Sequence, residues 1–364
     1  MKYRLEDICS FRKEKVAVSS LTLKNYISTE NMLPNKAGIT KATSLPKCNT
    51  TQRFECGDVL VSNIRPYFKK IWKAKFNGGC SNDVLVFSSK EGFDTEFLYY
   101  VLSDDSFFEY SMATSKGTKM PRGDKKSIMN YEVPGFDMNI QIKIASILKS
   151  IDDKIELNNK INNNLEQQVS ALYKSWFEDF EITNSVCPEN WSYQELSTIA
   201  DIASGKRPPV KSDICNEETP ISIVGAASVM GFTSEANHTD KILVTGRVGT
   251  HGVIQRFNTP CWTSDNTLVI TSPYYEFTNQ ILHRIDYPSM NRGSTQPLIT
   301  QGDMKNVVVL VPDKGTLEKF EEFSGSLMAK WEANNKENVK LVSLRDTLLP
   351  KLMSGELEVC NLEL

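Results

Sequence analysis

Apolar and polar residues recur most regularly between Asn139 and Phe180, near the middle of the 364-residue chain. Two sets of apolar side chains lie there at heptad spacing, one formed by Leu148, Ile155, Val169 and Trp176 and the other by Ile144, Ile151, Leu165 and Leu172. Neither Pro nor Gly interrupts the segment. At a rise of about 1.5 Å per residue, the pattern predicts a single helix about 60 Å long. A helix with so narrow an apolar stripe needs a partner.

A second heptad pattern, from Thr316 to Lys351, is the expected partner. Its apolar positions are Phe320, Leu327, Leu341 and Leu348 in one set and Phe323 and Leu344 in the other, each 172 residues after a counterpart in the first pattern. Asn162 and Asn334 are matching polar interruptions, and a buried Asn often fixes the register of such a seam. We therefore predict two long antiparallel coiled-coil helices from an internal, pseudo-twofold duplication. The alternative, in which each helix packs only on its own globular neighbour, stays open.

The segments outside the helices have the mixed character of α+β globular domains. Short β-like runs between Gly, Pro and Asn predict strands at 58–64 and 83–87, and later at 221–225, 241–245, 267–271 and 306–311. The predicted order is a globular domain (1–139), a central helix (140–180), a second globular domain (181–313) with a linker at 181–190, and a C-terminal helix with its tail (314–364).

The two globular domains share short strings. GDVLVSNIRP at 57–66 precedes SNDVLVF at 81–87, and ILVTGRVG at 242–249 precedes SDNTLVI at 264–270. The two pairs are offset by 182 to 183 residues. This predicts a duplication of about 180 residues in which the globular parts have diverged more than the helices.

Composition is that of an ordinary globular protein, with 40% hydrophobic and 24% charged residues. No apolar run approaches the roughly 20 residues of a membrane span, and the first 15 residues lack the apolar centre of a signal peptide, so we expect a cytoplasmic protein without a membrane partner. The eight Cys show no C-x-x-C pair and only three His are present, which favours reduced thiols and no metal site.

Longer strings resemble the specificity (S) subunit of type I restriction–modification systems. In the first half they are VLVSNIRPYFKKIW, CSNDVLVF and GTKMPRGDKKSIMNYEVP, followed by LKSIDDKIELNNKINNNLEQQVSALYKSWFEDF; in the second they are GRVGTHG, GSTQPLITQGDMKNVVVLVP and LRDTLLPKLMSGELEV. The resemblance implies two target-recognition domains, each reading half of a split double-stranded DNA sequence, held apart by two antiparallel helices. It also implies two methyltransferase (M) subunits and, through the complex, restriction (R) subunits as partners. No cofactor is then expected on this chain, whereas the partner subunits would use S-adenosylmethionine, ATP and Mg.

Charge supports DNA binding for only one of the two domains. Residues 1–139 carry 21 Lys and Arg against 16 Asp and Glu, a net charge of +5, whereas residues 181–313 carry 9 against 14, a net charge of −5. Because phosphate neutralisation supplies most non-specific affinity for DNA, the second domain would bind poorly alone. If the resemblance holds, partner subunits must supply much of the phosphate contact.

Candidate DNA-binding residues lie in loops that follow predicted strands. In the first half they are Arg65, Lys69, Lys70, Lys73, Lys116, Lys119 and Arg122, with the aromatic residues Tyr67, Phe68 and Trp72 interleaved; in the second half they are Arg247, Thr250, His251, Arg256, Arg292, Ser294, Thr295 and Gln296. Arg and Lys donate to guanine or phosphate, and a Gln amide can pair with adenine. A solvated charged face with the aromatic residues in the core is the alternative.

The search for catalytic motifs found none, so we predict a non-catalytic subunit. The glycines at 246, 249 and 252 lack the Lys-Ser/Thr ending of a P-loop, and Pro208-Pro209 is not part of an N-P-P-Y or D-P-P-Y methyltransferase motif. Two other functions stay open: a coiled-coil scaffold that does not read DNA, and a restriction-associated enzyme with an unrecognised active site.

Apolar residues also persist near the ends of both predicted helices. Trp176, Phe177, Leu349 and Leu352 exceed what a two-helix seam can bury, so we expect the M subunits to cover them.

Overall fold

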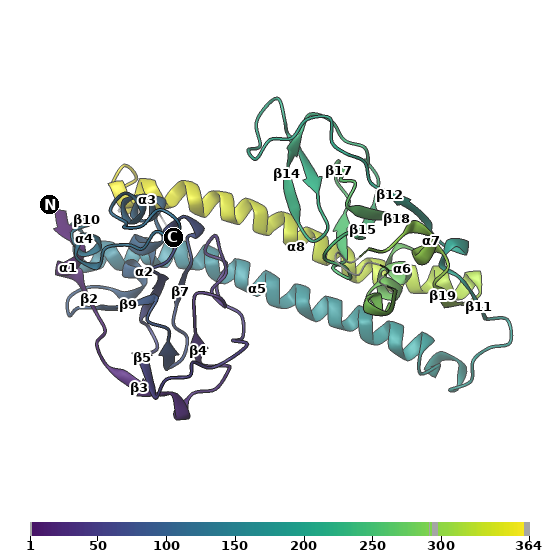
Figure 1. Cartoon of the computed structure of the whole chain (residues 1–364), viewed down its shortest axis with the longest axis horizontal. Coiled ribbons are helices and arrows are strands. Elements are labelled where there is room, and N and C mark those ends of the chain that lie inside the picture. The colour runs from purple at the N-terminus through teal and green to yellow at the C-terminus, as the bar shows by residue number, and fades with distance from the viewer. Residues whose placement is uncertain (1, 291, 293–297, 360–364) are drawn as a thin grey trace. The chain divides into compact units, whose positions relative to one another are not determined.

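The computed structural model describes residues 2–290, 292 and 298–359. The chain divides into two compact units: unit 1 is Met1–Asn158 with Lys336–Leu364, and unit 2 is Asn159–Asn335. The two longest helices, α5 (Met138–Phe177) and α8 (Lys314–Ser354), each contribute one part to either unit (Figure 1). Both helices are close to their predicted ranges, and the α+β class is confirmed.

Unit 1 is built on two four-stranded sheets and one strand pair. The first sheet is antiparallel, with the order β2 (Cys9–Phe11), β9 (Val84–Ser89), β6 (Val59–Ser62) and β7 (Ile71–Lys73). The second has the order β3 (Lys15–Ala17), β5 (Thr50–Phe54), β8 (Gly78–Cys80) and β4 (Tyr26–Ile27), in which β4 and β8 are parallel. Strands β1 (Lys2–Arg4) and β10 (Glu132–Pro134) form the antiparallel pair.

The central strands β6 and β9 read as unbroken apolar runs because both of their faces are buried. Val59 and Val61 belong to the core shared with the helices, whereas Leu60 between them packs with Phe54 and Trp72 on the other face. The helices of unit 1 besides α5 and α8 are α1 (Leu5–Ile8), α2 (Thr95–Ser103), α3 (Asp105–Ala113) and α4 (Lys125–Met129), with 3-10 turns η1 (Val18–Ser20) and η2 (Pro66–Phe68).

Unit 2 has a four-stranded sheet, a three-stranded sheet and a strand pair. The four-stranded sheet is antiparallel, with the order β12 (Asp201–Ser204), β18 (Thr267–Thr271), β15 (Ile242–Gly246) and β16 (Gln255–Phe257). The three-stranded sheet has the order β14 (Val229–Thr233), β13 (Ile221–Val224) and β17 (Trp262–Thr263), and β11 (Ser192–Glu195) pairs with β19 (Val308–Val311). Its shorter helices are α6 (Tyr275–Leu282) and α7 (Gln301–Lys305), with 3-10 turns η3 (Glu181–Thr183), η4 (Leu196–Thr198) and η5 (Tyr287–Met290).

The two units repeat one topological plan. The order β2-β9-β6-β7 in unit 1 matches β12-β18-β15-β16 in unit 2. The parallel pair β4/β8 matches the parallel pair β13/β17, and β1/β10 matches β11/β19. The predicted internal duplication is therefore confirmed in the topology of the sheets.

The long helices pair in antiparallel fashion within each unit. In unit 1, Asn158 Nδ2 donates to Asn338 Oδ1 at 2.9 Å and Arg345 contacts Asp152 at 2.8 Å. In unit 2, Asn334 Nδ2 donates to Asn162 Oδ1 at 2.8 Å. Residue numbers rise along α5 as they fall along α8, as predicted, and the predicted Asn162 and Asn334 do meet in the seam.

The predicted separation of 172 residues between equivalent helix positions is wrong by one helical turn. Asp137 and Asp313 cap the two helices, since their carboxylates accept from the N–H groups of Ile140 and Thr316. These caps lie 176 residues apart, and so do the buried pairs Ile144 and Phe320, and Asn158 and Asn334. With this separation, the Asn158–Asn338 and Asn334–Asn162 bonds are equivalent.

Two residues placed in the seam by the shorter separation lie outside it. Phe323 is 57% exposed and Leu344 is 48% exposed. Heptad core positions alternate at three and four residues, so a shift of four residues superimposes one apolar stripe on the other. Apolar spacing alone therefore cannot distinguish the two separations.

The expected partner-covered residues at the helix ends are mostly covered by the chain itself. Leu349 (3% exposed) and Leu352 (1%) belong to the core of unit 1, and Phe177 (5%) belongs to that of unit 2. Trp176 is half-buried against Phe177 and Phe320. The expectation that M subunits cover these residues is wrong for Phe177, Leu349 and Leu352, because each globular part packs over the helix ends.

Candidate nucleic-acid interface

Two basic segments of unit 1 lie against each other beyond the end of β6. The N–H of Arg65 donates to Pro121 O at 2.8 Å, and the N–H of Gly123 donates to Asn63 O at 3.2 Å. The N–H of Asn63 donates in turn to Asp83 O at 2.8 Å. The loop after β6, the loop at 116–123 and the start of β9 thus form one surface.

The predicted cations of this surface differ in how firmly the protein holds them. Carboxylates pair with Lys69 (Asp105, 2.7 Å), Lys116 (Asp124, 2.8 Å), Arg122 (Asp83, 3.1 Å) and Lys73 (Glu96). Lys70 donates to Thr29 O at 2.6 Å, and burial lowers its pKa. Exposed ion pairs contribute about 0–1 kcal/mol, so Lys116 and Arg122 can exchange a carboxylate for a phosphate. The half-buried Lys70 and Lys73 instead support the loop, whereas Lys119 is exposed.

Unit 2 carries the equivalent surface after β15. The N–H of Arg247 donates to Asn266 O at 2.8 Å, and Arg247 O accepts from Ile299 at 3.0 Å. These bonds repeat those of Asn63 in unit 1, so Arg247 occupies the place of Asn63. Gly249 then occupies the place of Arg65, and both have a positive φ (83° and 51°).

A tight turn follows Arg247. A Cβ on Gly246 would lie 1.8 Å from Thr250 O, so only glycine allows this approach. His251 Nδ1 lies 3.1 Å from Gly246 O, and Thr250 is exposed. The glycines make the turn that the sequence predicted, and they present Thr250 and His251 beside Arg247.

Arg256 has no access to a ligand. Its side chain is 10% exposed, and its guanidinium donates to both carboxylate oxygens of Glu276, at 2.8 and 2.5 Å. It also stacks over Tyr275 and Trp331. The prediction that Arg256 contacts DNA is wrong, because it forms a buried ion pair whose partner lies 20 residues away in sequence.

The remaining predicted residues of unit 2 lie near the masked turn. Arg292 is exposed and pairs with Asp303 at 2.5 Å. Ser294, Thr295 and Gln296 lie outside the described residues.

Sequence reasoning missed further basic residues of unit 2. Lys206 and Arg207 follow β12 and are exposed, and no ion pair is found for them among residues 2–290, 292 and 298–359. The N–H of Lys206 donates to Thr263 O at 2.9 Å, and Trp262 Nε1 donates to Lys206 O at 2.8 Å. This brings the string GKRPP beside Ser264. Its signal was two adjacent cations directly after a strand.

Buried polar atoms without a partner cluster at both surfaces. Within the described part of the chain, no hydrogen-bond partner is found for Asn63 Oδ1, Arg65 Nε and Ser81 Oγ in unit 1, or for Arg247 Nε, His251 Nε2 and Ser264 Oγ in unit 2. Ser81 and Ser264 are equivalent, since their N–H groups donate to Ile27 and Val224 on the matching strands β4 and β13. An unpaired buried polar atom costs about 1–3 kcal/mol, so its repetition in two diverged units indicates a surface that binds polar groups.

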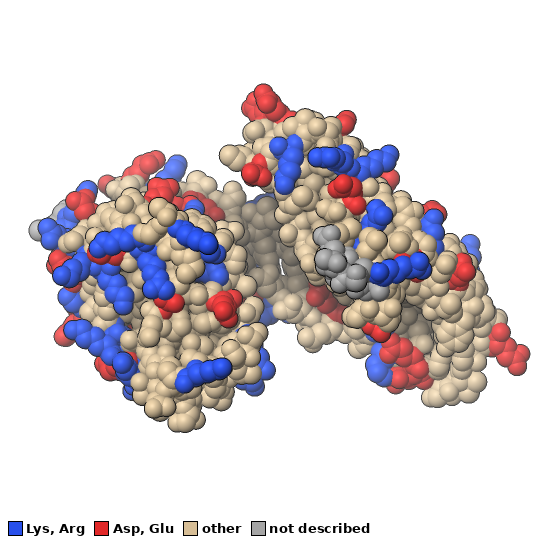
Figure 2. All heavy atoms as spheres, in the orientation of Figure 1, with Lys and Arg blue, Asp and Glu red and all other residues tan. Residues whose placement is uncertain are grey.

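The surface charge agrees with this placement in unit 1. Figure 2 shows many Lys and Arg side chains on the visible face of unit 1, and fewer, mixed with acidic ones, on unit 2. The predicted difference between the two halves therefore persists at the surface.

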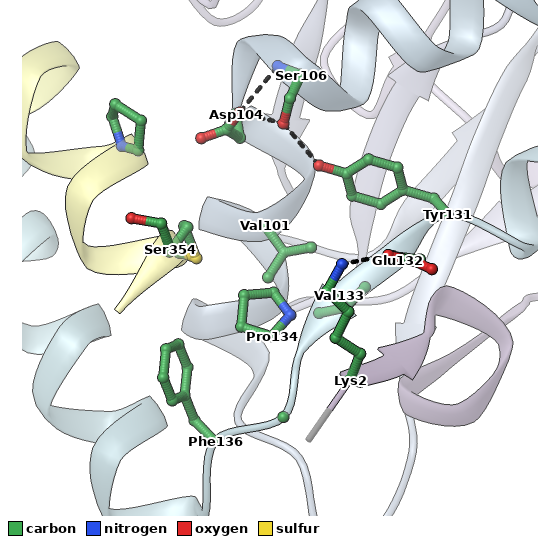
Figure 3. Close-up of a pocket in the computed structure, with 13 residues that line it drawn as sticks. Lys2, Val101, Asp104, Ser106, Tyr131, Glu132, Val133, Pro134, Phe136 and Ser354 are labelled. Atoms are coloured by element: carbon green, nitrogen blue, oxygen red, sulfur yellow. Dashed lines mark hydrogen bonds and ion pairs between the residues drawn. The ribbon is translucent and has the colours of Figure 1, made fainter. Parts of the chain in front are cut away.

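A cavity of about 730 Å³ in unit 1 is lined by β10, α2, α3 and the end of α8 (Figure 3). Ser106 Oγ lies 2.7 Å from the Tyr131 hydroxyl, and the Ser106 N–H donates to Asp104 at 2.8 Å. Burial raises the pKa of Tyr131, and Lys2 is paired with Glu132. No His or Cys lines this cavity, which therefore offers no nucleophile-and-base pair of those residue types.

Two further searches covered the described residues only. No three His, Cys, Asp or Glu side chains in that part of the chain lie together as a metal site requires. Within the same residues, no helix combines the length and the apolar character needed to cross a bilayer. Burial raises the pKa of Cys9 and Cys80 to about 12 and that of Cys261 to about 11, so these thiols stay protonated near neutral pH.

Comparison with known proteins agrees with the site. A profile of the type I restriction modification DNA specificity domain matches residues 1–167. The MjaIX specificity subunit of Methanocaldococcus jannaschii is 27% identical over 308 residues, which cover 74% of this chain and 71% of that protein. The HindI specificity subunit of Haemophilus influenzae is 22% identical, over 98% of this chain and 99% of that protein. The chain belongs to the type I specificity-subunit family.

A solved member of the type I S-subunit group shares the fold. The type I restriction–modification S subunit from M. genitalium superimposes with a TM-score of 0.59 at 20% identity, over 97% of this chain and 96% of that one. The resemblance seen in the sequence is thus confirmed, and the duplicated α+β plan with two long helices is the fold of this specificity subunit.

Proposed function

We propose that this specificity subunit reads a bipartite DNA target, with unit 1 reading one half and unit 2 the other. The observation that carries the proposal is the repeated surface after β6 and β15, where equivalent backbone bonds place Asn63 and Arg247 beside equivalent serines. Side chains of these types donate to or accept from base edges in the major groove. A non-specific spacer would separate the two half-sites.

The long helices would set the length of that spacer and dock two methyltransferase subunits. Support comes from the seam, in which an Asn–Asn hydrogen bond fixes the pairing register once in each unit. Restriction subunits would join through the complex. In this proposal the partners bring S-adenosylmethionine, ATP and Mg, and the chain itself acts without catalysis.

Partner subunits would also supply phosphate contacts that unit 2 lacks. Of its predicted cations, Arg256 is buried and Arg292 is paired. Since affinity for DNA depends on phosphate neutralisation, the isolated chain should bind weakly, and the assembled complex should bind with a steep salt dependence.

Footprinting of the co-expressed complex on its target tests this function. We expect protection of two separate tracts flanking a gap, and a mass that corresponds to two methyltransferase subunits per chain. A scaffold without DNA reading would give no target-dependent protection. An enzyme with an unrecognised active site would bind S-adenosylmethionine as the isolated chain.

A further inference from the structure

Two neighbouring aromatic side chains project from the basic surface of unit 1. Tyr67 is 48% exposed and Phe68 is 37% exposed, whereas the third interleaved aromatic residue, Trp72, is buried. The Tyr67 and Phe68 rings pack on each other with centroids 4.6 Å apart. The sequence left open whether these residues belong to the core, and the structure places only Trp72 there.

The backbone that carries this pair is strained at both ends. Arg65 and Lys69, which flank η2, have φ of 51° and 49°, in the left-handed region that non-glycine residues rarely adopt. Such conformations persist only where the surroundings impose them, and they cluster at functional sites.

A second loop imposes the conformation. Asn35 and Lys36 also have positive φ (55° and 61°), and their N–H groups donate to Phe68 O at 2.8 Å and to Lys69 O at 2.9 Å. Asp105, at the start of α3, binds the ammonium groups of both Lys36 (2.8 Å) and Lys69 (2.7 Å). The aromatic pair is therefore held rigidly outward, so little conformational entropy would be lost when it packs on a ligand.

We propose that Tyr67 and Phe68 form a wedge that packs against base faces of the half-site read by unit 1 and unstacks one base step there. This inference rests on the proposed function and names a contact that hydrogen-bond readout does not include. Aromatic side chains stack on bases whatever their sequence, and apolar wedges inserted between base steps kink the duplex.

The chemistry around the wedge selects DNA over a protein partner. The loop bearing Arg122 is bonded to the wedge loop through Arg65 and Pro121, and it also carries the exposed Lys119. Met120, 47% exposed, adds an apolar group between these cations. An apolar tip inside a cationic rim complements stacked bases flanked by phosphates.

Unit 2 has no such wedge. At the equivalent place Gly249 is followed by Thr250 and His251, and no 3-10 turn is found there among the described residues. Unstacking by this wedge should therefore occur in only one of the two half-sites.

The test uses the complex of the full chain with its methyltransferase partners, after its target has been mapped. 2-Aminopurine is placed at successive positions of both half-sites, and its fluorescence is compared between wild type and the variant Y67A/F68A. We expect a signal present in wild type and absent in the variant, confined to the half-site read by unit 1. Target affinity should fall roughly ten- to a hundredfold, as expected for lost base stacking.

Two further variants sharpen the result. Y67L/F68L keeps an apolar tip and should retain part of the signal, because aliphatic wedges also part base steps. Y193A removes an aromatic residue that is 74% exposed on β11 of unit 2 and should change neither signal nor affinity.

Three results would overturn the wedge. The first is unchanged fluorescence and affinity in Y67A/F68A, while R247A still weakens target binding; the proposed function would then survive. The second is loss of partner subunits from Y67A/F68A alone, which would make the pair a protein interface. The third is a wild-type complex that prefers no split target, which would overturn the proposed function as well.

Discussion

At the scale of residues, two arginines nine positions apart show why charge in a sequence does not locate a site. Arg247 lies on the loop after β15, with its backbone bonded to Asn266 and Ile299. Arg256 lies on β16, and its guanidinium is spent on Glu276 between two aromatic rings. Only the fold brings Glu276 to Arg256, so no local pattern could separate the two roles.

Replacing Arg256 tests its structural role. Arg256→Ala leaves the buried Glu276 carboxylate without its partner, so we expect the free energy of unfolding to fall by about 3 kcal/mol. Denaturant unfolding of the chain measures this, with Arg292→Ala, which removes an exposed pair, as the control. Base preference of the folded variant should be unchanged, and altered preference without loss of stability would contradict the assignment.

At the scale of elements, a carboxylate on α8 holds the start of α6. Glu321 accepts from the N–H groups of Glu276 at 3.1 Å and Phe277 at 2.8 Å. Burial raises the pKa of Glu321 from its ordinary value of 4.5 to about 7, against the opposing effect of the two donors. Folding therefore favours the protonated side chain.

This pKa predicts a pH dependence of stability. Because the pKa is higher in the folded state, the stabilisation is complete below about pH 4.5 and is lost as the pH rises through about 7. The difference in unfolding free energy between wild type and Glu321→Gln should then change by about 2–3 kcal/mol over this window. The exposed neighbour Glu322→Gln is the control. A difference that stays constant between pH 4.5 and 7 would refute the assignment.

The asparagine pairs of the seam make a second prediction at this scale. Asn162→Leu alone leaves the Asn334 amide buried without its acceptor, which should cost about 1–3 kcal/mol. The double variant N162L/N334L should recover most of this loss, since both polar groups are then gone. Thermal unfolding of the single and double variants measures the coupling, and strictly additive losses would show that the two amides do not depend on each other.

The sequence predicted these elements better than their register. Strands at 59–62, 84–89, 242–246 and 267–271 were predictable because apolar runs mark strands buried on both faces. The one-turn error in the helix duplication arose because heptad spacing repeats after four residues as well as seven. The caps Asp137 and Asp313 carried the missing information, since a cap occurs once per helix. Base-contact candidates such as Ser81 and Ser264 had to await the fold, because burial without a partner is not visible in a sequence.

At the scale of the whole molecule, one topological plan occurs twice with different chemistry. The loop after β6 carries an aromatic wedge and cations, whereas the loop after β15 carries glycines, Thr250 and His251. The shared plan explains how two units could read DNA in the same manner, and the divergent loops explain how they could read different bases.

If the helices set the spacer, lengthening both should lengthen it. We propose inserting four residues after Lys160 in α5 and four after Lys336 in α8, because these positions lie between the two asparagine pairs and 176 residues apart. Each helix gains about 6 Å, and DNA rises about 3.4 Å per base pair, so the spacer should grow by one or two base pairs. The half-site sequences should stay the same, as determined by methylation mapping. The same insertion in α5 alone would break the asparagine register and serves as the control.

The most direct test of two-part reading is a genome-wide map of bases methylated by the co-expressed complex, for wild type, R247A and K119A/R122A. Wild type should give one motif of two short parts separated by a gap of fixed length and free sequence. R247A should relax the bases of one part only, and K119A/R122A those of the other only, each by about 1–3 kcal/mol of discrimination if the residue contacts a base. An uninterrupted motif, or relaxation of the same part by both variants, would contradict the assignment of one half-site to each unit.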